Sequence, residues 1–312
     1  MAAEISVVRA GFQSTWFIPF FCQMISISHP MDAKGADWSP ARELYPGIQL
    51  LQEKRAEPRN VTISCVRIDL QTPGLRLHTT GRARSWERNA TETIRQSTRE
   101  FIRLSAATNR RIVFAANADA FSPWPAPWNK PTPTDLNGLA VSDGIVVSPP
   151  SGSPSLLIRK DGTASIQKTD PEFSTEDIQT AVSGFAFCLI DAQPQPSGTD
   201  LHPRTGLGLS ADARYLLIMA VDGRRHSSRG ATTHELGRWL LEYGADDAIN
   251  MDGGGSTTLA WWNSSSDRDD KCELINTPVG NGMKFESELA DQAYVPTERL
   301  NGNNIGVYYL SP

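Results

Sequence analysis

Short apolar runs separated by turn residues dominate the chain from residue 60 onwards, and this pattern predicts mostly strands. "NVTISCVRIDL" (60–70) alternates apolar and polar positions, and "LRLHTT" (75–80), after the turn "TPG", is predicted to be its hairpin partner. Two further hairpins are predicted at 139–147 and 156–167, with Asp-Gly turns. Buried or closing strands are predicted at "RRIVFAAN" (110–117), "RYLLIMAV" (214–221), "DAIN" (247–250) and "NNIGVYYL" (303–310).

Helical spacing occurs in two stretches. "ATETIRQSTREFIRLSAATN" (90–109) predicts a helix with Thr91 as its N-cap, and "ATTHELGRWLLEYGADD" (231–247) predicts an amphipathic helix that Gly244 ends. Strands and helices mix without strict alternation, so we predict an α+β fold, a single domain with a mixed or antiparallel sheet packed by a few helices.

The proline-rich stretch "FSPWPAPWNKPTPTDLNG" (121–138) interrupts this pattern and is expected to hold no regular element. Such long loops are uncommon in compact domains and are often functional. Two interpretations stay open: a surface flap pinned by Trp124 and Trp128, or a wall that faces the substrate.

The first 58 residues differ from the rest. They are irregular and rich in Pro, Gly and charge, so we predict a leader and linker over 1–58 and a catalytic domain over 59–312. "VVRAGFQSTWFIPFFCQMISIS" (7–28) resembles a secretory signal, although polar residues dilute its apolar part. A secreted or periplasmic protein follows from the signal-like interpretation; a disordered tail or a misassigned start leaves the cytoplasm open.

Composition narrows the class of partner. Of 312 residues 39% are hydrophobic and 21% charged, which is ordinary for a globular protein, and the formal net charge is −5. A mildly acidic chain gives no electrostatic reason to bind nucleic acid or anionic membranes, and no apolar run approaches the length of a transmembrane span. The four cysteines lack the spacing of a metal site. The sequence is compatible both with one disulfide and with buried free thiols.

Two carboxylates are the first candidates for chemistry. Asp222 and Asp252 each end an apolar run and are each followed by glycine, so both side chains meet at one sheet edge if the strands are neighbours. Paired carboxylates are what glycosidic bond cleavage usually requires. The alternative is that Asp-Gly merely makes turns, which fits Asp252 poorly because more glycines and hydroxyls follow.

Groups suited to phosphate surround these carboxylates in the sequence. Three glycines can expose successive N–H groups to an anion or let a ligand approach the backbone, although the spacing is not that of a P-loop. The tripeptide "HPR" offers a histidine and an arginine, and arginine grips phosphate in a bidentate way; a solvated loop is the alternative. Two more arginines follow Asp222 and could supplement this tripeptide. The candidate phosphate-binding residues are therefore His202, Arg204, Thr205, Arg224, Arg225, Gly253, Gly254, Gly255, Ser256 and Thr257.

"ANADAF" (116–121) adds a polar pair after a strand. Asn117 and Asp119 are candidates for binding the substrate or a cation, and the alternative is a turn capped by their own side chains; the EF-hand spacing is absent. No cofactor is required by the sequence, but a divalent cation such as Ca²⁺ is compatible with this pair.

Together these clusters resemble one family. "HPRTGLG", "MAVDGRRHSSRGATTHELGRWLLEYGADDAINMDGGGSTTL" and "ERLNGNNIGVYY" resemble the phosphodiester glycosidases in order and spacing, tightly over 202–259 and again at the end. "NADAF" is similar to the family's Asn-Gly-Asp-Phe-Phe, with Ala118 and Ala120 as departures.

The resemblance implies hydrolysis of the sugar C1–O bond of a sugar-1-phosphodiester, N-acetylglucosamine-like, to free sugar and a phosphomonoester. Phosphate leaves well without protonation, so the transition state needs cations at the phosphate and a carboxylate at the sugar. Asp252, Asp222 and His202 are the expected catalytic residues, with Asp252 as nucleophile or base.

Two other functions fit some of the residues. In a metal-dependent phosphodiesterase, Asp119, Asp222, Asp252 and His202 would ligate one divalent ion and the P–O bond would break. In a non-catalytic carbohydrate-binding protein of the envelope, the residues that stack on sugar rings would be Trp124, Trp128, Trp261 and Trp262.

Overall fold

A computed structural model describes residues 36–123, 129–280 and 294–310 of the chain. The chain divides into two units, residues 1–32 and 33–312. All described residues belong to the second unit, and the signal-like stretch, Trp124 and Trp128 lie outside them.

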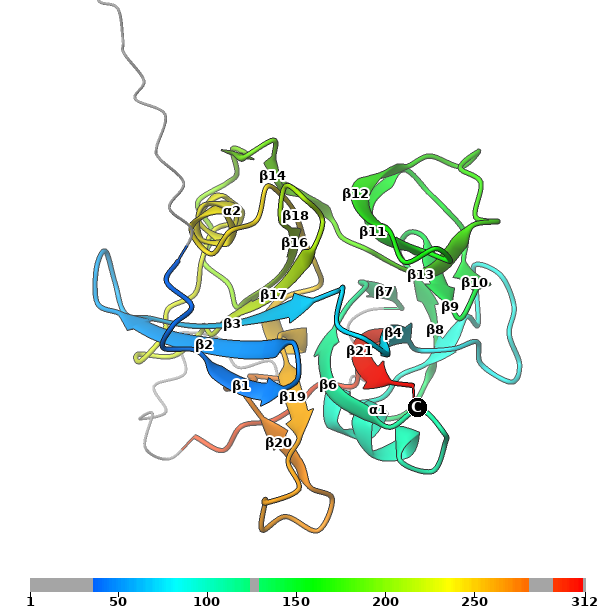
Figure 1. Cartoon of the computed structure of the whole chain (residues 1–312), viewed down its shortest axis with the longest axis horizontal. Helices are drawn as coiled ribbons and strands as arrows, with labels where there is room; N and C mark the ends of the chain where they lie inside the picture. The colour runs from blue at the N-terminus through cyan, green and yellow to red at the C-terminus, as the bar shows by residue number, and fades with distance from the viewer. Residues whose placement is uncertain (1–35, 124–128, 281–293, 311–312) are drawn as a thin grey trace, which may run out of the picture. The chain divides into compact units, whose positions relative to one another are not determined.

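Antiparallel sheets make up most of this unit, as Figure 1 shows. The described ranges contain twenty-one strands and two α-helices, so the predicted α+β class is wrong and the fold is mainly β. The prediction rested on two helical stretches, 90–109 and 231–247, and the first contains a shorter helix than expected because the residues before it are extended. The antiparallel pairing, which the prediction allowed, is present in every sheet.

An eight-stranded sheet carries the candidate site at one of its ends. Both of its faces are buried, which explains why the central strand is apolar throughout instead of alternating. Its strands, in spatial order, are β1 (Arg42–Tyr45), β2 (Ile48–Arg55), β3 (Val61–Asp69), β17 (Tyr215–Val221), β16 (Arg204–Leu209), β18 (Asp247–Asn250), β14 (Ala186–Ile190) and β15 (Gln193–Pro194).

Helix α2 (Thr233–Glu242) covers one face of this sheet, where Figure 1 shows it over β14, β16 and β18. Its N-terminus is a capping box, in which Thr232 and Glu235 each bond to the other's backbone N–H. Leu236 and Leu240 pack on Met219 of β17 and its neighbours. Gly244 follows the helix with a φ of +105°, so the predicted C-terminal glycine is confirmed.

Two five-stranded sheets share the core of the opposite face. The first consists of β20 (Cys272–Leu274), β19 (Leu259–Trp262), β6 (Ile112–Asn117), β21 (Asn304–Tyr309) and β4 (Leu75–Thr79). The second consists of β10 (Ile145–Ser148), β9 (Ala140–Ser142), β13 (Ile178–Ser183), β11 (Ser153–Arg159) and β12 (Ala164–Thr169). Both predicted Asp-Gly hairpins, β9–β10 and β11–β12, are confirmed.

Strand β4 pairs with β21 and not with β3, so its predicted hairpin is wrong. The intervening turn ends at Gly74, whose φ of +77° lets the chain leave one sheet and enter another.

Helix α1 (Thr98–Ser105) is shorter than predicted and begins after Ser97, not Thr91. The residues before it run extended: β5 (Thr93–Ile94) pairs with β8 (Pro133–Leu136), and Thr93 donates to the carbonyl of Gly302. Buried polar side chains with tertiary partners thus override the helical periodicity of this stretch.

The proline-rich stretch contains regular structure at its two ends. Strand β7 (Phe121–Ser122) pairs with β8, so the expectation of no regular element there is wrong. The prolines do not prevent it because these strands are short and form a sheet of only three with β5.

Residues 42–55 were expected to be irregular, and this expectation is also wrong. Strand β2 pairs with β3 along its whole length, and β1 pairs with β2. Among the described residues, neither helix has the length and apolar content that a bilayer span needs.

Candidate active site

The ends of four strands bring the predicted motifs together. Asp222 directly follows strand β17, β18 leads into Asp252, β16 begins at Arg204, and β6 ends at Asn117. In the antiparallel pair β16–β17, Arg204 lies opposite Val221, so the "HPR" and "DGR" motifs meet at one edge. The backbone N–H of Gly254 donates to the carbonyl of Pro203 over 2.8 Å, which ties the glycine loop to this edge.

Asp252 is the partly exposed carboxylate of this edge. Burial raises its pKa to about 6, although the Ser256 hydroxyl, the charge of Arg299 and the N–H of Gly253 each lower the pKa. A carboxylate with a pKa near 6 is an effective proton acceptor near neutral pH, because half or more of it is ionised there.

The glycine loop makes room for guanidinium groups. A Cβ at Gly254 would lie 2.9 Å from Nη2 of Arg224, and one at Gly255 would lie 2.3 Å from Nη2 of Arg299. Gly254 also has a φ of +61°. The loop does not present three successive free N–H groups, since that of Gly254 donates to the carbonyl of Pro203. Its glycines are therefore required chiefly for close approach.

Arg224 is the side chain best placed to take an anion. Its φ is +61°, a conformation that non-glycine residues adopt rarely and that clusters at functional sites. Its guanidinium forms no hydrogen bond or ion pair with the residues that the structure describes, and partial burial lowers its pKa. A half-buried cation held without a counter-charge favours binding of an anionic ligand.

Arg204 extends this positive region, and His202 lies close to both arginines. Arg204 donates to the carbonyls of Ala231 and Asp200, which fix its position without neutralising it. Burial lowers the pKa of His202, and the charges of Arg204 and Arg224 lower it further, so its imidazole is neutral at pH 7.

Asn117 connects three of the motifs. Its Nδ2 donates to the carbonyl of Asp252 over 2.7 Å, and its Oδ1 accepts from the Thr205 hydroxyl and from the N–H of Thr258. Asn117 and Thr205 are fully buried. Their contacts position the backbone on either side of Asp252, which differs from the direct substrate contact that we predicted for them.

Asp222 lies at the same edge but in a different environment. It is 3% exposed, and its oxygens accept from Nδ2 of Asn276 and twice from the N–H of Thr277. Burial raises its pKa to about 6. Asn276 also donates to the carbonyl of Thr257, so Asp222 clamps the segment after β20 to the glycine loop.

Asp119 is buried beside the backbone of Asp252, whose N–H donates to the carbonyl of Ala118, but its carboxylate has other partners. Its oxygens accept from the N–H of Ser183 and Nδ2 of Asn303, and burial raises its pKa to about 8. No group of three or more His, Cys, Asp or Glu side chains in the described ranges could hold a metal ion. Asp119, Asp222, Asp252 and His202 are thus not brought together as ligands, contrary to the metal-dependent alternative.

Comparison with known proteins fits this arrangement of motifs. The family model of phosphodiester glycosidases matches residues 104–296, well over half of the chain. The chain belongs to the phosphodiester glycosidase family. The SPbeta prophage-derived uncharacterized protein YomE of Bacillus subtilis (strain 168) is 29% identical over 175 residues, which are 50% of this chain and 25% of YomE. The chain thus spans about a quarter of that relative's length.

Solved structures share the fold of this family member. The catalytic domain of zebrafish N-acetylglucosamine-1-phosphodiester alpha-N-acetylglucosaminidase, auto-inhibited by its pro-peptide, has a TM-score of 0.59 at 17% identity, covering 84% of this chain and 82% of that one. A hypothetical protein from Synechocystis has a TM-score of 0.59 at 13% identity, covering 88% and 64%. At these identities the likeness concerns the fold alone.

Two residues of the site escaped the sequence analysis. Arg299 is 6% exposed and donates from Nη1 to the Ser256 hydroxyl over 3.2 Å, and Asn276 holds Asp222. Arg299 lies within "ERLNGNNIGVYY", a segment that carries the family resemblance, so its place in that motif was the available signal. Nothing in the local sequence distinguishes Asn276.

Of the four tryptophans of the carbohydrate-binding alternative, the two that the structure describes are used for packing. Trp261 packs edge-on against Tyr45 and lies under Arg42, while Trp262 lies under Arg111. Each lies in β19, beyond the glycine loop, and each is half-buried.

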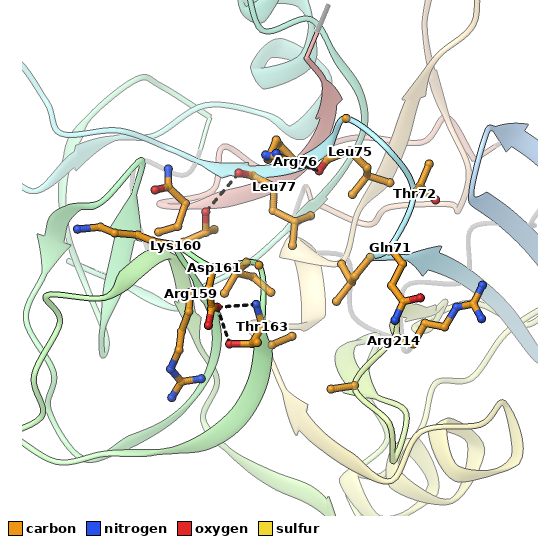
Figure 2. A pocket seen from close by; sticks show the side chains of 18 of the residues that line it. Gln71, Thr72, Leu75, Arg76, Leu77, Arg159, Lys160, Asp161, Thr163 and Arg214 are labelled. Carbon is orange, nitrogen blue, oxygen red and sulfur yellow. Dashed lines mark hydrogen bonds between the residues drawn. The ribbon is translucent and has the colours of Figure 1, made fainter. Parts of the chain in front are cut away.

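A cavity of about 1030 Å³ lies at the other end of the β16–β17 hairpin. Figure 2 shows its lining, which includes Leu75 and Leu77 of β4, the β11–β12 turn around Asp161, and Arg214 in the β16–β17 turn. No predicted site residue lines it.

Proposed function

We propose that this protein hydrolyses the C1–O bond of a sugar-1-phosphodiester, N-acetylglucosamine-like in its sugar, and releases the free sugar and a phosphomonoester. The observation that carries the proposal is the charge imbalance at the glycine loop. Arg204 and Arg224 lack carboxylate partners among the described residues, and Arg299 lies beside them, while Asp252 is the partly exposed acid.

The arginines suit the phosphate half of such a substrate. Water adds to C1, and the electrons of the breaking C1–O bond pass to the phosphate, which leaves as a monoester with one more negative charge. Cations that are already in place stabilise this charge as it develops. Arg224 is unpaired within the described chain and Arg204 is fixed by carbonyl oxygens, so both are preorganised for this task.

Asp252 suits the sugar half. As a carboxylate it stabilises the cationic character that develops at C1, and it acts either as the nucleophile or as the base that takes a proton from water. Phosphate needs little protonation on leaving, so one ionised carboxylate is sufficient. Asp222, whose oxygens are bonded to Asn276 and Thr277, holds the loop in register for Asp252.

The family membership supports the bond class, and the zebrafish enzyme with this fold supports N-acetylglucosamine as the first sugar to test. The direct experiment is hydrolysis of an N-acetylglucosamine-1-phosphodiester in ¹⁸O-labelled water, followed by mass spectrometry of both products. We expect the label in the sugar. Label in the phosphate would mean P–O cleavage and would overturn the proposal, and an intact ester would reject this substrate.

A further inference from the structure

Arg299 reaches the site from a segment that no catalytic motif predicted. It precedes β21 by a few residues, and its guanidinium lies flat against Gly255, where a Cβ would be 2.3 Å from Nη2, 2.7 Å from Cζ and 3.1 Å from Nε. A side chain at residue 255 and this guanidinium therefore exclude each other. The arginine is 6% exposed, too little to act mainly as a surface charge.

The contacts of Arg299 lead to the acid. Its Nη1 donates to the Ser256 hydroxyl over 3.2 Å, and Ser256 is fully buried. The Ser256 side chain in turn lowers the pKa of the Asp252 carboxylate. A hydroxyl that accepts from a cation donates more strongly to an anion, so the chain from arginine to serine to aspartate favours the ionised acid.

The charges around Asp252 support a separate role for Arg299. From the β16 end come His202 and Arg204, from the segment after β17 comes Arg224, and from the segment before β21 comes Arg299. Of these four groups, Arg299 is the one whose charge lowers the pKa of Asp252, and Asp252 raises the pKa of Arg299. Burial nevertheless lowers the pKa of Arg299 to about 10, so it remains charged at neutral pH.

We propose that Arg299 is a positioning residue that, through Ser256, holds the Asp252 carboxylate in place and ionised for reaction. This inference rests on the proposed function, because it assigns Arg299 to the acid and leaves Arg224 and Arg204 for the phosphate. It also explains why residue 255 is glycine, because the guanidinium of Arg299 occupies the space that a side chain at residue 255 would need.

The test measures the titration of Asp252 directly. Protein labelled with ¹³C at the aspartate carboxyl carbons is titrated by NMR, and the Asp252 resonance is the one lost in Asp252→Asn. In Arg299→Met we expect its midpoint to rise by about 1 pH unit or more, as for loss of an opposite charge at close range. Ser256→Ala should raise it less, and Arg299→Lys should raise it less than Arg299→Met.

Arg214→Met is the matched control, because it removes an arginine that pairs with Asp69 at the other end of the sheet. Its midpoint for Asp252 should equal that of the wild type. A folded Arg299→Met protein with an unchanged midpoint would overturn the inference. If that variant does not fold, an unchanged midpoint in both Ser256→Ala and Arg299→Lys overturns it equally.

The proposed function is tested separately by turnover. The acid limb of the pH profile of kcat/KM should move with the NMR midpoint in each variant, whereas a purely structural loss would lower kcat/KM equally at every pH. A shifted midpoint without turnover of any sugar phosphodiester would reject the proposed function and leave the coupling of Arg299 to Asp252 established.

Discussion

The two ends of the β16–β17 hairpin are both rich in arginine and aspartate, yet their charges are organised differently. At the cavity end, Arg214 forms an ion pair with Asp69, and Arg159 pairs with Asp177. Asp161 accepts from Thr163 of its own turn, as Figure 2 shows. At the glycine-loop end, Arg224 has no partner among the described residues, and Asp252 is held with a raised pKa.

This difference separates a structural surface from a reactive one. The pKa of Asp69 is lowered by its bond to Arg214, which means that the folded protein already satisfies the charge. Burial instead raises the pKa of Asp252 and lowers that of Arg224, so folding leaves both groups in a state that a ligand can improve. The size of a cavity is therefore a poorer guide to chemistry here than unbalanced charge.

The largest expected effect comes from removing the acid. Asp252→Asn should lower kcat about 10³-fold, because the variant lacks the nucleophile or base and retains the phosphate contacts. Steady-state hydrolysis of the sugar phosphodiester measures it. Asp161→Asn, at the cavity end, is the control and should be as active as the wild type. Equal losses in both variants would abolish the distinction between the two ends.

Removing the unpaired cation should weaken anion binding. Arg224→Met is expected to raise the Kd for inorganic phosphate about tenfold or more, since a charge-assisted hydrogen bond contributes about 1.5–3 kcal/mol. Isothermal titration calorimetry gives the constants. Arg214→Met should leave the Kd unchanged, because that guanidinium is committed to Asp69. A larger effect for Arg214→Met would place the anion in the cavity.

Alanine substitutions at Gly254 and Gly162 compare the two ends of the hairpin directly. Gly254 and Gly162 both have positive φ, at +61° and +89°, so alanine strains either backbone by about 1–2 kcal/mol. Gly162→Ala has open space, whereas the new methyl of Gly254→Ala meets the Arg224 guanidinium. We expect similar losses of thermal stability in both variants but a several-fold rise of KM only in Gly254→Ala. Unchanged KM in Gly254→Ala would contradict the proposed place of Arg224.

The smallest effect is on the pH dependence of stability, where the two ends have opposite signs. The folded pKa of Asp252 is raised from 3.8 to about 6, so its contribution is full at low pH and is lost as pH rises through about 6. The folded pKa of Asp69 is lowered, so its contribution is present above 3.8 and is lost as pH falls further. Urea unfolding at several pH values measures both.

The two asparagine variants identify each contribution. Asp252→Asn should flatten the stability curve between about pH 4 and pH 6, and Asp69→Asn should flatten it below pH 4. An Asp69→Asn variant that alters the curve near pH 6 would show that the two ends are coupled.

Much of the site was predictable because its motifs are continuous in sequence. Strands β6, β17 and β21 have runs of buried residues that no turn interrupts, and each functional motif directly precedes or follows a strand. Order along the chain was therefore enough to predict Asp252, Arg204 and Arg224 as candidates.

The rest depended on contacts between distant residues. Arg299 meets Ser256 across 43 positions, and Asn276 meets Asp222 across 54. Strand β4 finds its partner at the far end of the chain, and the buried polar residues before α1 are held extended by β8. Local periodicity carries no information on such pairings, which is why α1 was predicted too long and the mainly β fold was missed.

Strands β1 and β2 have a practical consequence for anyone who shortens this protein. Strand β3 is buried on both faces and is paired along its whole length with β2. A version that starts at residue 59 would leave β3 as a bare apolar edge, the kind of surface that recruits further chains and precipitates. Trp38, which packs against Tyr243 of the α2 cap, would also be lost. A truncation for crystallisation should accordingly retain everything from Ala36 onwards.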